Sequence, residues 1–329
     1  MPDPRSVRRH AGWALLFAGT LVFPLALSQP REVNVGVQVL LFATLGTAWN
    51  LLGGYAGQFS FGHALFFGAG AYTSTLLVRA DLSPWLGMLA GAAVAALCAV
   101  VIGLPTFRLA GHYFAIATIV LAEVAQTVVR DIDALGAARG LSLPILPSAL
   151  VNYEFHESRV PYYYVILALY ALSLVATWAV ERHRLGYYLR AIREDETAAK
   201  SVGVSVLGYK LAAAAISAAL TALAGSFYAQ YVLFIDPDSV FPLSLSILIA
   251  LVPIAGGIGR SYGPLLGALV LFPLSEATRI QFGGTGRGID LVLYGALIVL
   301  ISVAEPGGIA ALGDRLRLRL GARARGAPA

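Results

Sequence analysis

The chain has 329 residues, of which 58% are hydrophobic and 12% are charged, with a net charge of +5 and a single cysteine, Cys98. A soluble domain carries about 25% charged residues, so this composition excludes an ordinary soluble protein and indicates one that crosses a membrane repeatedly. The lone cysteine excludes an internal disulfide and a thiolate metal site, and the apolar segments leave no room for a nucleic-acid-binding fold.

Ten apolar segments are the predicted elements, most of them close to the length of about 20 residues that an α-helix needs to cross a bilayer. Transmembrane β-strands, which alternate in polarity over about 10 residues, do not fit these runs. The sequence therefore predicts an all-α polytopic membrane protein, with a single transmembrane domain over 1–329 and some helices broken by glycine or proline. The expected spans are 12–28, 33–52, 61–78, 84–104, 111–129, 162–180, 211–231, 241–258, 262–278 and 289–304.

Residues 1–28 begin with arginines and continue into an apolar run that ends in small residues, as a signal peptide does. We favour an uncleaved first span, whereas cleavage would leave nine spans and an external N-terminus. With a cytoplasmic N-terminus and ten spans, 16 of the 23 lysines and arginines fall on the cytoplasmic side. The positive-inside rule then predicts that both termini are cytoplasmic, with 305–329 as a basic tail.

The first glycine-rich break interrupts the apolar sequence at 53–72. Non-helical backbone survives in a membrane only where it is buried in protein or lines a cavity, so this break indicates a substrate pathway or a packing seam. Its polar side chains carry donors and acceptors but no fixed charge, which favours a neutral or zwitterionic solute. The candidate pathway residues here are Asn50, Gly54, Tyr55, Gly57, Gln58, Ser60, Gly62 and His63.

A second glycine-rich break occupies 256–271 and adds Gly256, Gly257 and Gly259 to the candidate pathway. Two broken segments in the two halves of a transporter point to a central binding region between them. The G-x-x-x-G spacing of Gly259 and Gly263 also suits close helix packing, so packing and pathway both stay open.

Two acidic residues fall within predicted spans, Glu123 in the fifth and Glu276 near the end of the ninth. A charge at mid-bilayer costs at least about 2.5–3.5 kcal/mol, which makes such residues candidates for a proton or ion relay. We favour a structural role, because Glu123 lies two turns from the charged cluster 130–133 and Glu276 is placed to pair with Arg279 along the helix.

The polar loop 181–210 contains a predicted amphipathic helix at 186–206. Arg190 with Glu194 and Glu196 with Lys200 have the i,i+4 spacing of ion pairs, and Gly203 is placed as a left-handed cap. A solvated surface helix and a helix that docks into a partner's groove fit the pattern equally. Its apolar stripe consists of Leu189, Ile192, Ala199, Val202 and Val206.

Catalytic chemistry is not indicated: the sequence predicts no catalytic residues, no metal site and no cofactor. The five histidines form no close pair at metal-binding spacing. Lys200 precedes Ser201, but the upstream glycine of a phosphate-binding loop is missing, so any ATP must be hydrolysed by another chain.

Five stretches in order resemble the permease subunits of branched-chain amino acid ABC importers, of the LivM type. The resemblance runs from about residue 39 to 308. The matching stretches are 49–72, 107–124, 186–230, 255–269 and 305–309.

The resemblance implies a bacterial inner-membrane permease that works with other chains. Those partners are a second, similar permease (LivH type), two ATP-binding subunits (LivG and LivF types) and an external solute-binding protein. It also implies that 186–206 is the segment that couples to the ATP-binding subunits. The residues at its recognisable positions, together with Ile192 from the stripe, are Arg190, Ala191, Ile192, Arg193, Glu194, Asp195, Ala198, Ala199, Gly203 and Lys210.

The solute stays open, because the sequence departs from the family pattern at 135–141 and 251–255, and such permeases also carry other amino acids, amides, urea or small aromatic acids. An ion-coupled secondary transporter is the alternative; it would need an intramembrane acid such as Glu123. If the stripe sits in a partner's groove, Ile192→Asp should detach the ATP-binding subunits and leave the membrane fold intact.

Overall fold

The computed structural model describes residues 20, 30–109, 111–155, 158–282, 292, 295–296 and 307–311, with the side chains of 30 and 278–282 excepted. The predicted spans 12–28 and 289–304 therefore lie almost wholly outside the described residues.

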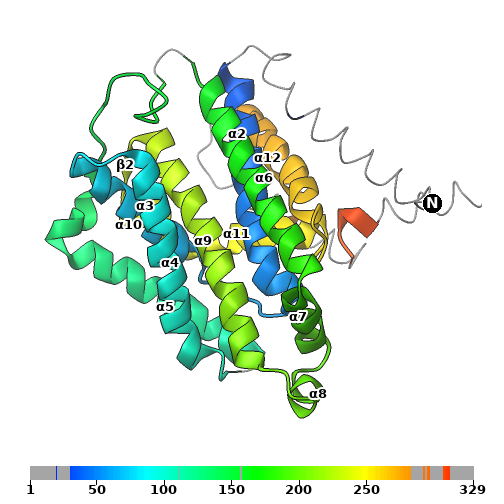
Figure 1. The fold of residues 1–329 in the computed structure, drawn as a ribbon. Coiled ribbons are helices and arrows are strands. Elements are labelled where there is room, and N and C mark those ends of the chain that lie inside the picture. Colours follow the sequence, from blue (N-terminus) through cyan, green and yellow to red (C-terminus); the bar gives the residue numbers. More distant parts are fainter. Residues whose placement is uncertain are drawn as a thin grey trace, which may run out of the picture.

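Long helices run side by side through the molecule, with two short helices at one end (Figure 1). Each long helix coincides with one of the apolar runs that predicted it. They are α2 (Pro30–Asn50), α3 (His63–Arg79), α4 (Pro84–Thr106), α5 (His112–Asp131), α6 (Val160–Arg182), α9 (Val206–Val232), α11 (Leu243–Gly256) and α12 (Gly263–Phe282).

Shorter elements connect the long helices. A π-helical turn, η1 (Leu51–Tyr55), extends α2, and α7 (Arg184–Glu194) and α8 (Glu196–Ser201) form a hairpin between α6 and α9. The opposite end of the molecule holds the 3₁₀ turns η2 (Asp133–Leu135) and η3 (Ala137–Arg139), the strands β1 (Leu141–Ser142) and β2 (Phe234–Ile235), and α10 (Pro237–Val240). The two strands are antiparallel and pair Leu141 with Ile235.

Helix boundaries follow local sequence signals. Proline at the first or second helical position opens α4 and α6, where a missing backbone N–H removes no hydrogen bond. Asp236 caps α10 through a reciprocal capping box with Ser239. The chain leaves α11 at Gly257, whose φ of +130° lies in a region that favours glycine.

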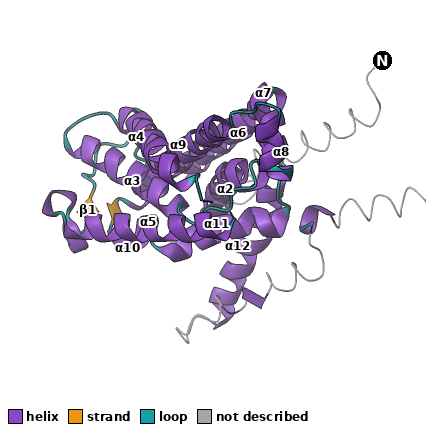
Figure 2. Ribbon diagram, turned by 90° about the horizontal axis from the view of Figure 1, so that it is seen from below, coloured by secondary structure: helices purple, strands orange, loops and turns teal. Residues whose placement is uncertain are grey.

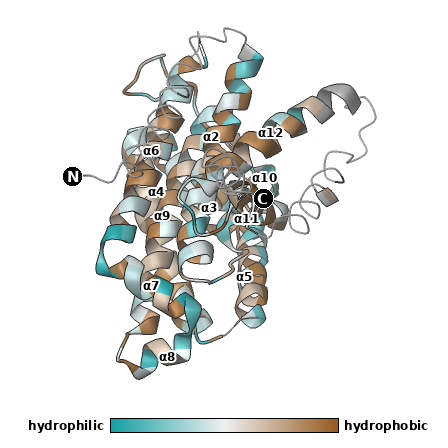
Figure 3. Ribbon diagram, turned by 90° about the vertical axis from the view of Figure 1, so that its right-hand side faces the viewer, coloured by the Kyte–Doolittle hydropathy of each residue, from teal (hydrophilic) through white to brown (hydrophobic). Residues whose placement is uncertain are grey.

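Within the described residues, six helical segments are long and apolar enough to cross a membrane, and a shorter apolar helix covers Gly263–Ala277. The six are Arg31–Tyr55, Pro84–Thr106, His112–Asp131, Val160–Arg182, Val206–Val232 and Pro237–Gly256. An all-α polytopic membrane protein is therefore confirmed, whereas a count of about ten spans is not. The predicted third span forms α3, which has only 17 residues. Hydrophilic residues gather at α7 and α8, beyond the apolar helices (Figure 3).

The core is built around α2, which lies among α6, α9, α11 and α12 (Figure 2). Its apolar segment is 83% buried, whereas that of α5, at the edge of the molecule, is only 22% buried. Helices α3, α4 and α9 pack closely because small residues stand at their crossings; a Cβ at Gly70 or Gly225 would clash with backbone of the facing helix.

Candidate functional site

The first break begins where α2 changes into the π-helical turn Leu51–Tyr55 and continues as irregular chain until α3 starts at His63. Side chains and backbone within the break satisfy several of the groups that the missing helix leaves unpaired. The indole of Trp49 donates to the carbonyl of Ser60 at 2.7 Å, and Gln58 N donates to Leu52 O at 3.0 Å. The break is therefore an internally hydrogen-bonded structure that is mostly buried in protein, as an apolar environment requires, with Phe59 exposed.

His63 and Ser217 form a polar contact deep inside the bundle. Nε2 of His63 lies 2.9 Å from Oγ of Ser217, and that hydroxyl donates to the carbonyl of Ala48 at 2.6 Å. A hydroxyl has one proton to donate, so His63 donates to Ser217 from Nε2. Nδ1 of His63 is then an acceptor, and it has no partner in the described part of the chain.

Other polar groups of the first break also bond within this chain. The hydroxyl of Ser60 accepts from Gly62 N at 3.2 Å, and Gln58 donates to the carbonyl of Ala56 at 3.3 Å. The hydroxyl of Tyr55 donates to the carboxylate of Glu181 at the end of α6. Glu181 also lies 3.9 Å from the guanidinium of Arg190 on α7.

Asn50 joins the two glycine-rich breaks, which are about 200 residues apart in the sequence. Its amide nitrogen donates to the carbonyl of Arg260 at 3.0 Å, and its amide oxygen accepts from Gly259 N at 2.9 Å. A Cβ at Gly54 would clash with the Asn50 side chain and stand 2.8 Å from Gly259 N. The two predicted breaks therefore meet directly.

Packing also explains part of the second break. A Cβ at Gly256 would clash with the backbone of Gly263 at the start of α12, and one at Gly267 would clash with the carbonyl of Val252. Gly257 N donates to the carbonyl of Pro253 at 2.8 Å and closes the end of α11. The packing interpretation is therefore supported for Gly256 and Gly267, whereas Gly259 lies against the first break and its place in a pathway stays a prediction.

Arg193 on α7 reaches both breaks from outside the bundle. Its Nη1 donates to the carbonyl of Gly54 at 2.6 Å. At Gly57 (φ +68°) a Cβ would stand 3.0 Å from Cγ of Arg193, and at Gly259 (φ +74°) it would stand 2.8 Å from Nη1. Two predicted pathway glycines, Gly57 and Gly259, therefore leave room for this side chain of the predicted coupling segment, and a third, Gly54, supplies the carbonyl that it bonds.

The segment predicted as one helix over 186–206 is two helices, and that expectation is wrong in this respect. Asp195 leaves helical geometry and its carboxylate accepts from the backbone of Thr197 and Ala198 at 2.8 and 2.9 Å, which makes it the N-cap of α8. Gly203 adopts the left-handed conformation that its position predicted, with φ of +86°.

Most of the apolar stripe packs inside its own chain. Leu189 and Ile192 are 0% and 3% exposed, and Ile192, Ala199 and Val206 form a small buried cluster. Val202 is 79% exposed, so its expected place in the stripe is wrong. An aspartate at position 192 would disturb this packing, so Ile192→Asp would measure folding and not docking.

The outward surface of the hairpin carries other residues of the predicted coupling set. Ala191, Glu194, Asp195 and Ala198 are exposed on it, together with Val202. The expected ion pair between Arg190 and Glu194 is absent from this described segment, because Arg190 pairs with Glu181 instead.

Lys210, at the start of α9, is buried and pairs with Glu196 at 2.6 Å. Glu196 also pairs with Lys200 at 3.1 Å, as the i,i+4 spacing predicted. Burial raises the pKa of Glu196, but the hydrogen bonds and charges of Lys210 and Lys200 together outweigh it, and the pKa lies below its ordinary value. These charges fasten α8 to α9.

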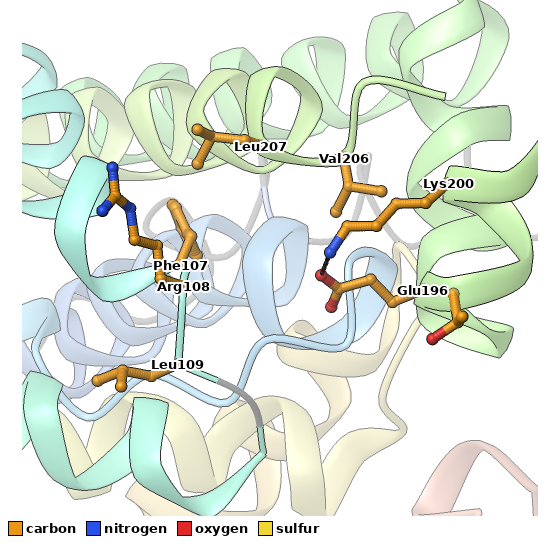
Figure 4. A pocket seen from close by; sticks show the side chains of 8 residues that line it. Phe107, Arg108, Leu109, Glu196, Lys200, Val206 and Leu207 are labelled. Carbon is orange, nitrogen blue, oxygen red and sulfur yellow. Dashed lines mark ion pairs between the residues drawn. The ribbon is translucent and has the colours of Figure 1, made fainter. Parts of the chain in front are cut away.

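A pocket of about 400 Å³ opens beside this ion pair, between the end of α4 and the hairpin (Figure 4). Its walls combine apolar side chains with two cations and one anion. The lining residues are Phe107, Arg108, Leu109, Glu196, Thr197, Lys200, Val206 and Leu207.

The two intramembrane acids differ in their surroundings. Glu276 pairs with Arg31 of α2 at 3.1 Å, whereas the side chain of its expected partner, Arg279, lies outside the described residues. Glu123 is exposed on the outer face of α5, and its carboxylate makes no ion pair within the described ranges.

Sequence reasoning missed several residues that build this site. Trp49, Glu181 and Ser217 fix the first break, and Thr118 and Ser246 cap the backbone N–H groups of Phe61 and Ala64 at 3.0 and 2.8 Å. The available signal was chemical: hydroxyl and indole groups in apolar runs need partners, and a broken helix offers them.

The family model described as branched-chain amino acid transport system / permease component matches residues 33–302. The chain belongs to this family. No solved structure shows a significant match to it.

Curated relatives of this permease family cover most of the chain. It is 27% identical to the high-affinity branched-chain amino acid transport system permease protein LivM of Salmonella typhimurium, over 93% of this chain and 76% of that protein. Its identity to the same protein of Escherichia coli is 26%, over 97% and 79%. The high-affinity branched-chain amino acid transport system permease protein LivH of Escherichia coli is 25% identical to it, over 82% of this chain and 90% of that protein.

Proposed function

We propose that this chain is the membrane permease subunit of an ATP-driven importer of branched-chain amino acids or a related small polar or amphipathic solute. Family membership supports the transport role, and the names of the relatives support the solute class. The proposed partners are a second permease of the LivH type, two ATP-binding subunits and an external solute-binding protein. The proposed location is the bacterial cytoplasmic membrane, with both termini in the cytoplasm.

The observation that carries the proposal is the position of the α7–α8 hairpin. It lies beyond the ends of the membrane helices, and Arg193 and Arg190 connect it to the first break and to α6 (Figure 1). The outer surface of the hairpin is polar and can bind another subunit, while its inner side is bonded to the first break. Movement of a bound subunit can therefore displace the hairpin and, through it, the breaks. A purely structural membrane protein would not require a polar hairpin that is hydrogen-bonded to a broken segment.

We propose that the two breaks line the pathway and change conformation during transport. Trp49 and Asn50 fix the backbone of the two breaks through bonds to Ser60, Gly259 and Arg260. Alternating access then requires these bonds to be exchanged for others when ATP-binding subunits close, because a ligand shifts an equilibrium only through different interactions with the two states.

The surface proposed to dock the ATP-binding subunits is the exposed side of the hairpin, with Ala191, Glu194, Ala198 and Val202. We expect Ala198→Arg to reduce co-purification of those subunits with the permease pair by at least about tenfold, because a large cation replaces a methyl group at the contact. Arginine is a good helix former, so α8 should persist. Pull-down and ATP-dependent uptake in vesicles, with the binding protein and a panel of solutes, measure both effects.

Ile145→Arg is the matched control, because Ile145 is 76% exposed in the loop at the opposite end of the molecule. It should assemble normally. If Ala198→Arg co-purifies and transports as the unmodified chain does, the hairpin is not the docking element.

A further inference from the structure

Arg193 occupies a seat made by the two broken segments. Its Nη1 donates to the carbonyl of Gly54, and the absent side chains of Gly57 and Gly259 leave the space that Cγ and Nη1 approach. Any larger residue at Gly259 would need both a left-handed backbone and the volume next to Nη1. The space beside Gly57 and Gly259, which we call the seat, therefore fits a long cationic side chain whose end reaches the Gly54 carbonyl.

The seat belongs to both breaks because Asn50 ties them together. Asn50 bonds to Gly259 N and to the carbonyl of Arg260, and Gly54 lies against the same amide. If the Gly54 carbonyl moves, the Asn50 side chain that lies against the same glycine must move too, and the hydrogen bonds of Asn50 to the second break are strained or broken. The guanidinium bonds to the first break at the Gly54 carbonyl and lies beside the second break at Gly259.

We propose that Arg193 is the positioning residue that passes movement of the α7–α8 hairpin to both broken segments, and that Gly54, Gly57 and Gly259 form its seat. This inference rests on the proposed function, since it assumes that ATP-binding subunits move the hairpin. An arginine suits the role because a charge-assisted hydrogen bond from a planar guanidinium fixes direction as well as distance.

Other routes also lead from the hairpin into the bundle, through the pairs of Arg190 with Glu181 and of Glu196 with Lys210 and through the chain itself, and the experiment must separate them from Arg193. The chain continues from α6 into α7 through His183, and Val204 and Ser205 lead from the hairpin into α9. If these connections alone carried the movement, removing the guanidinium would leave the breaks responsive to nucleotide.

The test uses the complete transporter in lipid nanodiscs and measures hydrogen exchange with and without a non-hydrolysable ATP analogue. In the unmodified complex we expect exchange to change in three windows: the hairpin at 184–201, the first break at 53–60 and the second at 256–262. In Arg193→Gln the change at 184–201 should persist, while the changes at both breaks are lost.

Transport gives the second readout. Arg193→Gln should still assemble and hydrolyse ATP, but the solute imported per ATP should fall about tenfold or more, the loss expected for one charge-assisted hydrogen bond. Arg193→Lys keeps the charge without the planar fork and should recover part of the ratio. Arg184→Gln, at the exposed start of α7, is the matched control and should change neither readout.

The inference is overturned if Arg193→Gln imports solute at the normal ratio or keeps nucleotide-dependent exchange at 53–60 and 256–262. It is also overturned if the variant loses its ATP-binding subunits, because Arg193 would then serve assembly. An unmodified complex that hydrolyses no ATP contradicts the proposed function itself, whereas a normal unmodified complex with an unaffected variant contradicts this inference alone.

Discussion

Lys210 illustrates how single residues fasten the hairpin to the membrane helices. Its side chain is 1% exposed, and one carboxylate, Glu196, neutralises it across the junction of α8 and α9. A buried ammonium without a partner is strongly unfavourable, so Glu196 determines where α8 can lie. The resemblance placed Lys210 in the coupling set, but only the structure shows that it faces inward, because a lone lysine at the start of an apolar run gives no sign of its partner.

We expect Glu196→Gln to destabilise the purified protein by about 1–3 kcal/mol, because the buried ammonium loses its counter-charge. Adding Lys210→Met should recover much of this loss, since an apolar side chain of similar size replaces the cation. Thermal unfolding of the two variants in the same detergent measures both effects. A Glu196→Gln protein as stable as the unmodified chain would show that the pair contributes nothing.

The same pair predicts a pH dependence for the junction. The pKa of Glu196 is lower in the folded protein than in the unfolded chain, where it is about 4.3, so the pair stabilises the fold fully above that value. Its contribution is lost as the pH falls through the lower pKa of the folded state. The stability difference between the unmodified chain and the Glu196→Gln, Lys210→Met double variant should therefore shift toward the double variant only in acid, and not between pH 5 and 8.

At the scale of elements, the sequence predicted that the polar loop between α6 and α9 contains helix, but not that it forms two short helices. Alternating charges and apolar residues predicted a helix, and Gly203 predicted its end. The break at Asp195 was missed because the helical periodicity continues through it, although an aspartate that can accept from the amides of the next turn is an N-cap signal. The pattern left a solvated surface helix and a docking helix equally open. It did not predict that the stripe packs against Val206 of α9 in its own chain, because these residues meet only in the folded protein.

We expect Asp195→Ala to destabilise α8 by about 0.5–2 kcal/mol, through loss of the bonds to Thr197 and Ala198. Faster hydrogen exchange confined to 196–201 would be the direct sign. Asp195→Asn keeps an accepting oxygen and should exchange nearly as the unmodified chain does. Equal protection of 196–201 in the alanine variant would contradict a capping role.

At the scale of the whole molecule, apolar length predicted the helices well and their number less well. Eight of the ten predicted spans fall on described helices, but α3 has only 17 residues, and the first and tenth spans lie almost wholly outside the described residues. The meeting of the two breaks followed from their placement in the two halves. Which groups join them did not follow, because the partner of Asn50 is backbone and leaves no trace in side-chain chemistry.

Glu123 separates the proposed importer from an ion-coupled transporter. Its carboxylate stands exposed on α5, so Glu123→Gln removes a charge without leaving a partner unpaired. ATP-driven uptake by the assembled complex should stay within about twofold, as for substitutions away from packed sites. Uptake assayed in vesicles with internal ATP, and separately with an ion gradient, tests this; loss of uptake with accumulation driven by the gradient would establish the ion-coupled transporter.

The π-helical turn at the end of α2 allows the first break to change its conformation without moving the rest of the helix. Such a turn holds one residue more than an α-helical turn, and one residue of an α-helix corresponds to about 100° of rotation and 1.5 Å of advance. Relaxing Leu51–Tyr55 to ordinary spacing would swing Tyr55 around the axis and away from Glu181, while the body of α2 stays where it is. A small displacement of the Gly54 carbonyl can thus produce a large rotation of the Tyr55 ring.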